Sequence, residues 1–269
     1  MPNCEFRLRI SKYKSQIENP RIEQLVMAIK ISKTFMMRKL HQLTGIVPLG
    51  AFFFVHLFTN SKSMSGAEVF NDAVADIHHI PYLLFVEVFG IFLPLLFHSV
   101  YGIFISAEMR SNALNYGYGR NWFYVFQRVT GVFLFFFILF HLLNLRFGAI
   151  PGLESYGNAV AGNADKAFAI VALEFQNPWI FIFYILGVTA TAWHLAYGFF
   201  LFAVDWGILI GERAQKMALY ACVGLAFFLS AVGINAMVAF NKKCGLLPSA
   251  LCEEAEKKGV VEPDGSKRF

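Results

Sequence analysis

Four of the seven histidines lie inside apolar segments, one in each of four successive segments: His56, His98, His141 and His194. Ionisable side chains are costly inside a bilayer and usually serve a function there. Zinc normally takes four protein ligands, or three and a water. Two imidazoles from facing helices, with no carboxylate or thiol at their level, suit the two axial positions of a haem iron, which then carries single electrons. The pattern predicts two haems b, each held by one pair of histidines.

The depths of the four histidines predict which of them pair. His98 and His194 lie about 25 Å from the start of their segments, at about 1.5 Å per helical residue. His56 and His141 lie near the far ends of segments that run in the opposite direction. The residues therefore occupy two levels, which pairs His98 with His194 and His56 with His141.

The residues around the histidines repeat between segments. His98 and His194 are each followed by the pattern x-x-Tyr-Gly, which places Gly102 and Gly198 one helical turn beyond them. A glycine has no Cβ, so a flat macrocycle can approach the backbone closely at these two positions. Similar Thr-Gly pairs open the other two segments, at Thr44-Gly45 and Thr130-Gly131.

The segments that position these residues are membrane helices. The sequence is 57% hydrophobic and 15% charged, whereas soluble domains are about 45–50% apolar and about 25% charged. Five segments reach the roughly 20 apolar residues that a spanning helix needs: about 40–60, 81–107, 121–146, 178–206 and 213–240. The expected fold is an all-α integral membrane protein in which the first four of five transmembrane helices form a haem-binding four-helix bundle. Residues 1–39 form a cytoplasmic segment, 40–240 the membrane domain and 241–269 a polar tail.

Lysines and arginines predict the orientation, because cytoplasmic loops carry an excess of them. They cluster before the first, third and fifth segments: Lys30, Lys33, Arg38, Lys39, Arg110, Arg120, Arg213 and Lys216. The loop after the first segment has Lys62 alone. We therefore predict a cytoplasmic N-terminus. The net charge of +5 comes from basic residues near the chain ends and does not indicate nucleic-acid binding.

The cysteines exclude two kinds of site. Cys4, Cys222, Cys244 and Cys252 form no CxxC and no CxxCH, so neither a zinc site nor covalent haem attachment is supported. Cys244 and Cys252 could pair in an oxidising space or remain free thiols, and the sequence leaves both alternatives open.

With these residues identified, the chain resembles the dihaem cytochrome b membrane anchor of succinate dehydrogenases and fumarate reductases, in its single-subunit, five-helix form. The resemblance runs from about Lys33 to Asn241 and is carried by several stretches: Gly66-Ala-Glu-Val-Phe-Asn71, His79-Ile-Pro81 with Glu87 and His98, Gln42-Leu-Thr44-Gly45, and Gln127-Arg128-Val-Thr130-Gly131. One departure is Ala192, because some members have a proton-relaying glutamate two residues before the ligand in the fourth span.

The resemblance implies that His56 and His141 hold the distal haem, and His98 and His194 the proximal one. It also implies a flavoprotein subunit, an iron–sulfur subunit docked on the cytoplasmic face, and a membrane quinone, commonly menaquinone. The expected location is the cell inner membrane, where the whole complex could form oligomers. Two other functions remain open: a cytochrome b subunit of a membrane hydrogenase or formate dehydrogenase, and a proton-coupled transporter. The motifs disfavour the first, and the apolar neighbours of each histidine disfavour the second.

Further polar residues inside the spans are candidate site residues. Glu87 near the start of the second span is a proton acceptor for quinol, a group that tunes the distal haem, or a hydrogen-bonding residue that fixes the first loop. Arg128, with Gln42 and Thr44, is a candidate for binding haem propionates, because arginine can hold a carboxylate with two bonds. Arg146 could do the same for the distal haem.

Overall fold

A computed structural model describes residues 20–241, and this part of the chain is helical with no strand. Residues 1–19 and 242–269 lie outside the described residues, and with them lie much of the predicted N-terminal segment, the polar tail, Cys4, Cys244 and Cys252. The chain divides into two compact units, residues 1–42 and 43–269. The described residues of the first unit belong to helix α2 (Pro20–Ile46).

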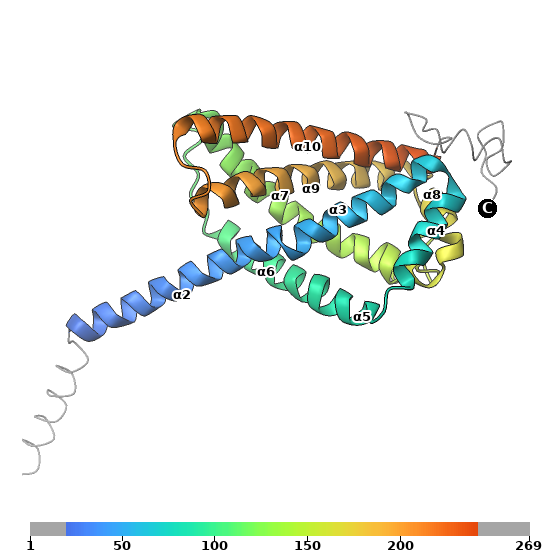
Figure 1. Cartoon of the computed structure of the whole chain (residues 1–269), viewed down its shortest axis with the longest axis horizontal. Helices are drawn as coiled ribbons and strands as arrows, with labels where there is room; N and C mark the ends of the chain where they lie inside the picture. Colours follow the sequence, from blue (N-terminus) through green and yellow to red (C-terminus); the bar gives the residue numbers. More distant parts are fainter. Residues whose placement is uncertain (1–19, 242–269) are drawn as a thin grey trace, which may run out of the picture. The chain divides into compact units, whose positions relative to one another are not determined.

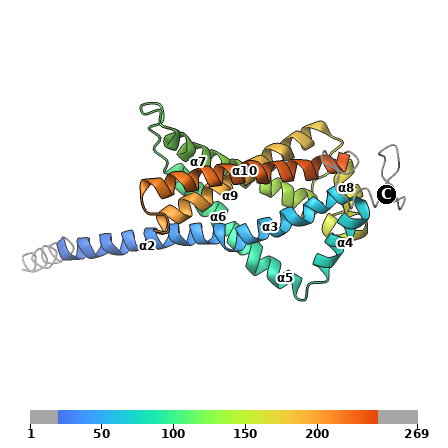
Figure 2. The same ribbon diagram turned by 45° about the horizontal axis from the view of Figure 1, so that its top comes forward.

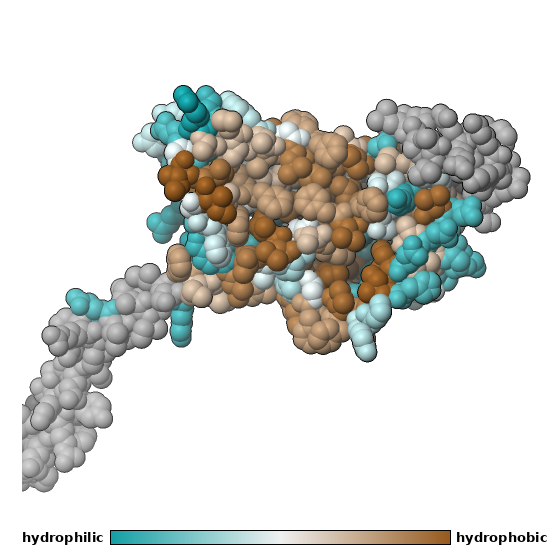
Figure 3. Space-filling view, viewed as in Figure 1, coloured by the Kyte–Doolittle hydropathy of each residue, from teal (hydrophilic) through white to brown (hydrophobic). Residues whose placement is uncertain are grey.

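The second unit contains four of the five helical stretches that could cross a membrane and most of the first. Its long elements are α3 (Pro48–Ser61), α6 (Leu93–Ala107), α7 (Gly119–His141), α9 (Pro178–Asp205) and α10 (Glu212–Asn241) (Figure 1). Among the described residues, five helical stretches are long and apolar enough to span a bilayer: Lys33–Ser65, Leu83–Ala107, Gly119–Arg146, Pro178–Asp205 and Glu212–Asn241. Figure 3 shows apolar surface over the middle of this unit and hydrophilic surface towards its two ends. The prediction of an all-α membrane protein with five spans is confirmed.

The second and third spans each contain a π-helical turn. The second span consists of α5 (Leu83–Val86), the π-helix η2 (Glu87–Phe92) and α6, and the third consists of α7 and the π-helix η3 (Leu142–Arg146). In η2 the Leu93 N–H donates to Val88, five residues earlier, directly before Pro94, which has no N–H to donate. A π-turn takes about one extra residue, which rotates the preceding side chains by about a quarter turn. A regular α-helix would place Glu87 and His98, eleven residues apart, near one face, and the π-turn between them shifts the two side chains away from that alignment.

Two short helices cover one end of the second unit. Helix α4 (Ala67–His78) begins after Gly66, whose φ of 106° suits glycine, and it buries Ala67, Phe70 and Val74 on one face. It packs beside α8 (Ala167–Glu174), as both ribbon views show (Figures 1 and 2). Asn71 joins the two helices, because its amide donates to the Asp165 carbonyl at 2.6 Å and accepts from the Phe168 N–H at 2.8 Å.

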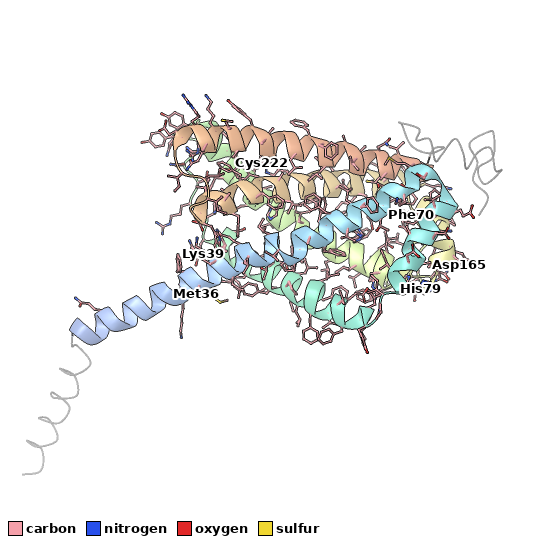
Figure 4. The ribbon with its side chains drawn as sticks, in the orientation of Figure 1. Met36, Lys39, Phe70, His79, Asp165 and Cys222 are labelled. Carbon is pink, nitrogen blue, oxygen red and sulfur yellow. The ribbon has the colours of Figure 1, made fainter. Side chains whose placement is uncertain are left out.

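These contacts explain the Gly66–Asn71 motif structurally. Its buried side chains and the Asn71 amide hold α4 and α8 together. In Figure 4, Phe70, His79 and Asp165 are labelled at this end, which we call the α4/α8 end. The turn between α9 and α10 lies at the opposite end (Figure 1). Cys222 lies nearer to that end (Figure 4).

The fifth span, α10, packs along α9 and against the end of the first span. A side chain at Gly233 would come within 2.5 Å of Val188, so the two helices approach closely there. The Ser63 hydroxyl in the turn η1 (Lys62–Ser65) donates to the buried Ala236 carbonyl at 2.8 Å. The four histidines lie on α3, α6, α7 and α9. Helix α10 carries none of them and packs against α9 and against the end of the span that contains α3.

Candidate functional site: two histidine pairs

The first pair joins α6 and α9. The ring centroids of His98 and His194 lie 6.3 Å apart with ring planes at 88°. His194 Nδ1 lies 3.2 Å from the Gln127 carbonyl and 3.3 Å from the Thr130 hydroxyl on α7. A carbonyl can only accept, so Nδ1 carries the proton and Nε2 keeps the lone pair that a metal would use. Helix α7 thereby fixes both the orientation and the tautomer of a ring that belongs to α9.

The glycines of the two Thr-Gly pairs give space to these same imidazoles. A Cβ at Gly131 would lie 3.0 Å from His194 Cε1, and a Cβ at Gly45 would overlap His98 Cε1 and lie 2.9 Å from its Nδ1. The approach at Gly45 needs glycine, because real Cβ atoms do not come so close to a ring, whereas a side chain at Gly131 would require the His194 ring to shift by a few tenths of an ångström. The sequence repeat was visible, but this contact with the histidines of the neighbouring spans was not, because it depends on how the helices are arranged.

Gln127 is a further residue of the site that the sequence did not single out as such. It is 8% exposed, and its amide donates to the His194 carbonyl at 3.0 Å. Its other amide atom, Oε1, is buried without a hydrogen-bond partner, as is the indole nitrogen of Trp193. A side chain at Gly198 would approach only Gln127 Nε2, at 3.8 Å, within 4 Å. The backbone one turn beyond His194 is therefore open to close approach by a flat group.

The second pair joins α3 and the end of α7. The ring centroids of His56 and His141 lie 5.7 Å apart with ring planes at 81°. The Asn60 amide donates to the His56 carbonyl at 2.8 Å and lies 3.4 Å from His56 Nε2, which favours an unprotonated Nε2. His141 contacts the Tyr184 ring at a centroid distance of 5.8 Å, and its Nδ1 is buried without a hydrogen-bond partner.

The spacing within each pair suits two axial ligands on one iron. A metal–imidazole nitrogen bond is about 2 Å long, and a ring nitrogen lies about 1 Å from its centroid, so two ligands in line place their centroids about 6 Å apart. The observed values are 6.3 and 5.7 Å. Among residues 20–241, no group of three His, Cys, Asp or Glu side chains could hold a bare metal ion. The residues of both pairs therefore fit a haem with two histidine ligands.

The pairs lie at different levels along the helices. His141 precedes the end of the third span at Arg146 by five residues, whereas His98 follows the start of the second span at Leu83 by fifteen. Both of these span ends belong to the α4/α8 end, so the levels differ by about 15 Å at about 1.5 Å per residue. The pair of His56 and His141 is the one nearer the α4/α8 end.

Each π-turn contributes one member of an ion pair. Arg146 Nη2, at the end of η3, lies 2.8 Å from Glu87 Oε2, at the start of η2. The two side chains are 33% and 16% exposed, respectively. The structure thus gives Glu87 a partner on the third span, and it gives Arg146 a carboxylate partner from the protein itself.

Comparison with known proteins identifies the family of the chain. Residues 110–233 match the family described as succinate dehydrogenase/fumarate reductase transmembrane subunit. The chain is also 37% identical over 209 residues to the succinate dehydrogenase cytochrome b558 subunit of Bacillus subtilis, an alignment that covers 78% of this chain and 98% of that relative. The chain belongs to this family. The expected resemblance is confirmed, and the chain is the membrane cytochrome b subunit of a succinate dehydrogenase or fumarate reductase.

The remaining candidate residues of this membrane subunit belong to α7, α2 and α6. The Arg128 guanidinium stacks 3.5 Å from the centroid of the Tyr124 ring, and its Nη1 donates to the Tyr124 carbonyl at 3.1 Å. Gln42 and Thr44 are half-buried in the last turns of α2, and Gly102 is half-buried on α6. Their predicted roles at the haems stay predictions.

Proposed function

We propose that the chain binds two haems b, one between His98 and His194 and one between His56 and His141, and carries electrons between an iron–sulfur subunit and a membrane quinone. The observation that supports this best is the presence of two imidazole pairs at two levels, each spaced for one iron. A haem with both axial positions filled supplies single-electron transfer. The relative's name, a cytochrome b558 subunit of succinate dehydrogenase, supports the same cofactor type.

The protein's own groups have distinct tasks in this proposal. Gln127 and Thr130 hold His194 in the tautomer that ligates through Nε2, and the Asn60 amide donates to the His56 carbonyl. Gly45 and Gly131 leave room for the imidazoles of the first pair. These groups set ring positions before any cofactor binds, and such second partners of a ligating histidine tune both orientation and basicity.

The proposed location is the cell inner membrane, with the N-terminus in the cytoplasm. Within the described residues, four basic side chains lie at or beside the end that carries the α9–α10 turn: Arg110, Arg120, Arg213 and Lys216. By the positive-inside tendency this is the cytoplasmic end, and we call it the inner end; the α4/α8 end is then the outer end. The pair of His98 with His194 is accordingly the inner pair, and His56 with His141 is the outer pair.

The partners follow from this orientation. A flavoprotein subunit and an iron–sulfur subunit would deliver electrons at the inner end, and a quinone, menaquinone in our proposal, would exchange electrons with the haems inside the bilayer. The succinate-oxidising site would lie on the flavoprotein subunit. The family membership favours this function over a hydrogenase or formate dehydrogenase cytochrome and over a proton-coupled transporter.

The haem content of the purified protein tests the proposal directly. We expect two haems b per chain, each six-coordinate and low-spin, because each of the two levels supplies two imidazoles. The measurements are haem and protein determination on one sample and an electron paramagnetic resonance spectrum of the oxidised protein. A ratio of one haem per chain, or a high-spin signal in intact protein, would contradict the pairing.

Docking of the iron–sulfur subunit can be tested by deletion. Removing residues 1–30 should weaken co-purification of that subunit while leaving the haem spectrum intact, because this segment precedes the first span and is cytoplasmic in the proposed topology. Removing residues 250–269, which the same topology places on the outer side, is the matched control and should leave the association unchanged. Loss of both haems on the first deletion would assign that segment to the haem-binding unit instead.

A further inference from the structure

A buried carboxyl group lies at the end of α8, outside the five spans. Glu174 is the last residue of that helix, and only 1% of its surface is exposed. Removing a carboxylate from water favours its protonated form, so burial raises the pKa of Glu174 above its usual range. Such a group is costly to maintain, and none of the roles proposed above uses it.

Glu174 belongs to a group of polar side chains that we call the buried polar cluster: Asn144, Ser155, Glu174 and Tyr184. The Ser155 hydroxyl donates to Asn144 Oδ1, and the Ser155 N–H donates to Glu174 Oε2 at 3.4 Å. Three atoms of the cluster lie next to one another without a hydrogen bond of ordinary geometry between them: Asn144 Nδ2, Glu174 Oε1 and the Tyr184 hydroxyl. Buried polar atoms without full partners are uncommon, and each calls for an explanation such as a catalytic or redox role.

The loop that covers the cluster depends on a glycine. Gly148 follows the third span with φ +55°, and a side chain there would lie 2.5 Å from the Ser155 carbonyl. The Gly157 N–H donates to the Gly148 carbonyl at 3.0 Å, so the loop folds back onto the end of the span. Glycine alone accepts this backbone and this approach. The loop therefore holds Ser155 against Asn144 and shields Glu174 from water.

Two side chains link the cluster to the outer histidine pair. The Tyr184 ring lies beside the His141 ring at a centroid distance of 5.8 Å. Asn144 follows His141 by three residues, in η3, and its side chain neighbours both the Glu174 carboxyl and the Tyr184 hydroxyl. A change of charge at His141 would act on Glu174 through this buried region, where charges interact more strongly than in water.

Few charged groups face Glu174 from the elements around it. Helices α4 and α10 contribute Phe70 and Phe240 to the apolar cluster on α8. Asp165 and Lys166 in the adjoining turn η5 (Ala164–Lys166) are exposed, and Arg146 at the end of η3 pairs with Glu87. Glu154, next to Ser155, is exposed; its backbone hydrogen bond lowers the pKa of Glu174, and its negative charge raises that pKa. Glu154 therefore marks the side from which protons could reach the cluster.

We propose that Glu174 is a proton-binding residue that takes up a proton from the outer face when the outer haem gains an electron, and releases it when that electron leaves. The inference rests on the proposed function, because it requires a redox group at His56 and His141. The electron comes from the iron–sulfur side, and the proton comes from water and adds to a carboxylate oxygen of Glu174. No other bond changes, and the local charge stays constant in both steps.

Proton binding at Glu174 and electron uptake by the outer haem are thermodynamically linked, and this linkage gives the direction in which the reduction potential changes with pH. An ionised Glu174 opposes an added negative charge, whereas a protonated Glu174 does not, so the reduction potential of the outer haem falls as pH rises. The fall is confined to the window between the Glu174 pKa with oxidised haem and its higher pKa with reduced haem. A tenfold change in proton concentration there shifts the potential by at most about 59 mV for one electron.

Redox titration of the purified protein at a series of pH values, from the usual range of a carboxyl group upwards, tests the proposal, since burial raises the pKa of Glu174. We expect the potential of the outer haem to depend on pH in the unmodified protein. Glu174→Gln should abolish that dependence, and Glu174→Asp should restore it at least partly. Asp165→Asn, which changes an exposed carboxylate in the turn before α8, is the matched control and should retain the dependence.

The outcomes separate the inference from the proposed function. An unchanged pH dependence in Glu174→Gln, with both haems present, overturns the role of Glu174 alone. A missing outer haem in the unmodified protein overturns the proposed function instead. If Glu174→Gln fails to retain the haem, the reduced-minus-oxidised infrared spectrum of the unmodified protein decides. A protonated-carboxyl band that appears on reduction and shifts in Glu174→Asp supports the proposal, and its absence overturns it.

Discussion

Replacing His98 or His194 with alanine is expected to remove the inner haem and leave the outer one in place. Each substitution deletes one of two axial ligands from the same iron, and a haem that is held without a covalent bond depends on both. The haem content should fall from two per chain to one, and a redox titration should lose the same component in both variants. His56→Ala and His141→Ala should each remove the other component.

Two control variants sharpen this test. His79 is exposed beside α4, so His79→Ala removes an imidazole without touching either pair and should keep both haems. Gly131→Val keeps all four histidines, but its side chain would press on the His194 ring, and it should alter the inner component only. Loss of one and the same component in both His56→Ala and His98→Ala would show that the levels have been assigned wrongly.

The spans were predictable because the bilayer sets their length and composition. Each predicted segment, such as 81–107 or 121–146, agrees with an observed span to within a few residues except the first, which extends back to Lys33. The two levels of histidines were predictable for the same reason, since depth along a straight helix depends on residue number alone. The structure brings together the residues that depth predicted, His98 with His194 and His56 with His141.

What the sequence could not supply depends on contacts between helices. The π-turns arise where local hydrogen bonding shifts by one residue, as it does before Pro94, and no periodicity shows this in advance. The loop after the third span contains an apolar run that forms α8, but this run is too short to span a bilayer and its composition alone does not predict where it packs. Glu174 stands at the end of that run, and only the folded loop shows that its carboxyl is buried.

Glu87→Gln is expected to slow quinone turnover by at least about tenfold, because a positioned acid or base commonly contributes a hundredfold or more to a proton transfer. Electrons that enter at the inner end reach the outer pair last, so a quinone that reacts after both haems would lie near the outer end. Quinone reduction takes up two protons with two electrons. Glu87 lies in the first π-turn of the second span, at that end, and is 16% exposed.

The ion pair with Arg146 makes glutamine the informative replacement. A glutamine side chain still accepts a hydrogen bond from Arg146, so the link between the two π-turns should survive while the exchangeable proton is lost. Both haems should remain, and so should succinate oxidation with an artificial acceptor that bypasses the membrane. Glu68→Gln, on the exposed face of α4 at the same end, is the matched control and should leave quinone turnover unchanged.

Glu87→Asp and Arg146→Gln distinguish a role of Glu87 in proton transfer from a purely structural role of its ion pair with Arg146. If the carboxyl itself transfers protons, Glu87→Asp should recover part of the turnover, and the pH profile of Glu87→Gln should lose the contribution of one ionising group. If the ion pair only joins the second and third spans, Arg146→Gln should disturb the outer haem spectrum, and Glu87→Gln should turn over quinone at the normal rate. That last result would leave Glu87 as a structural partner of Arg146, and the quinone site would then have to be sought at the inner end, beginning with Arg128.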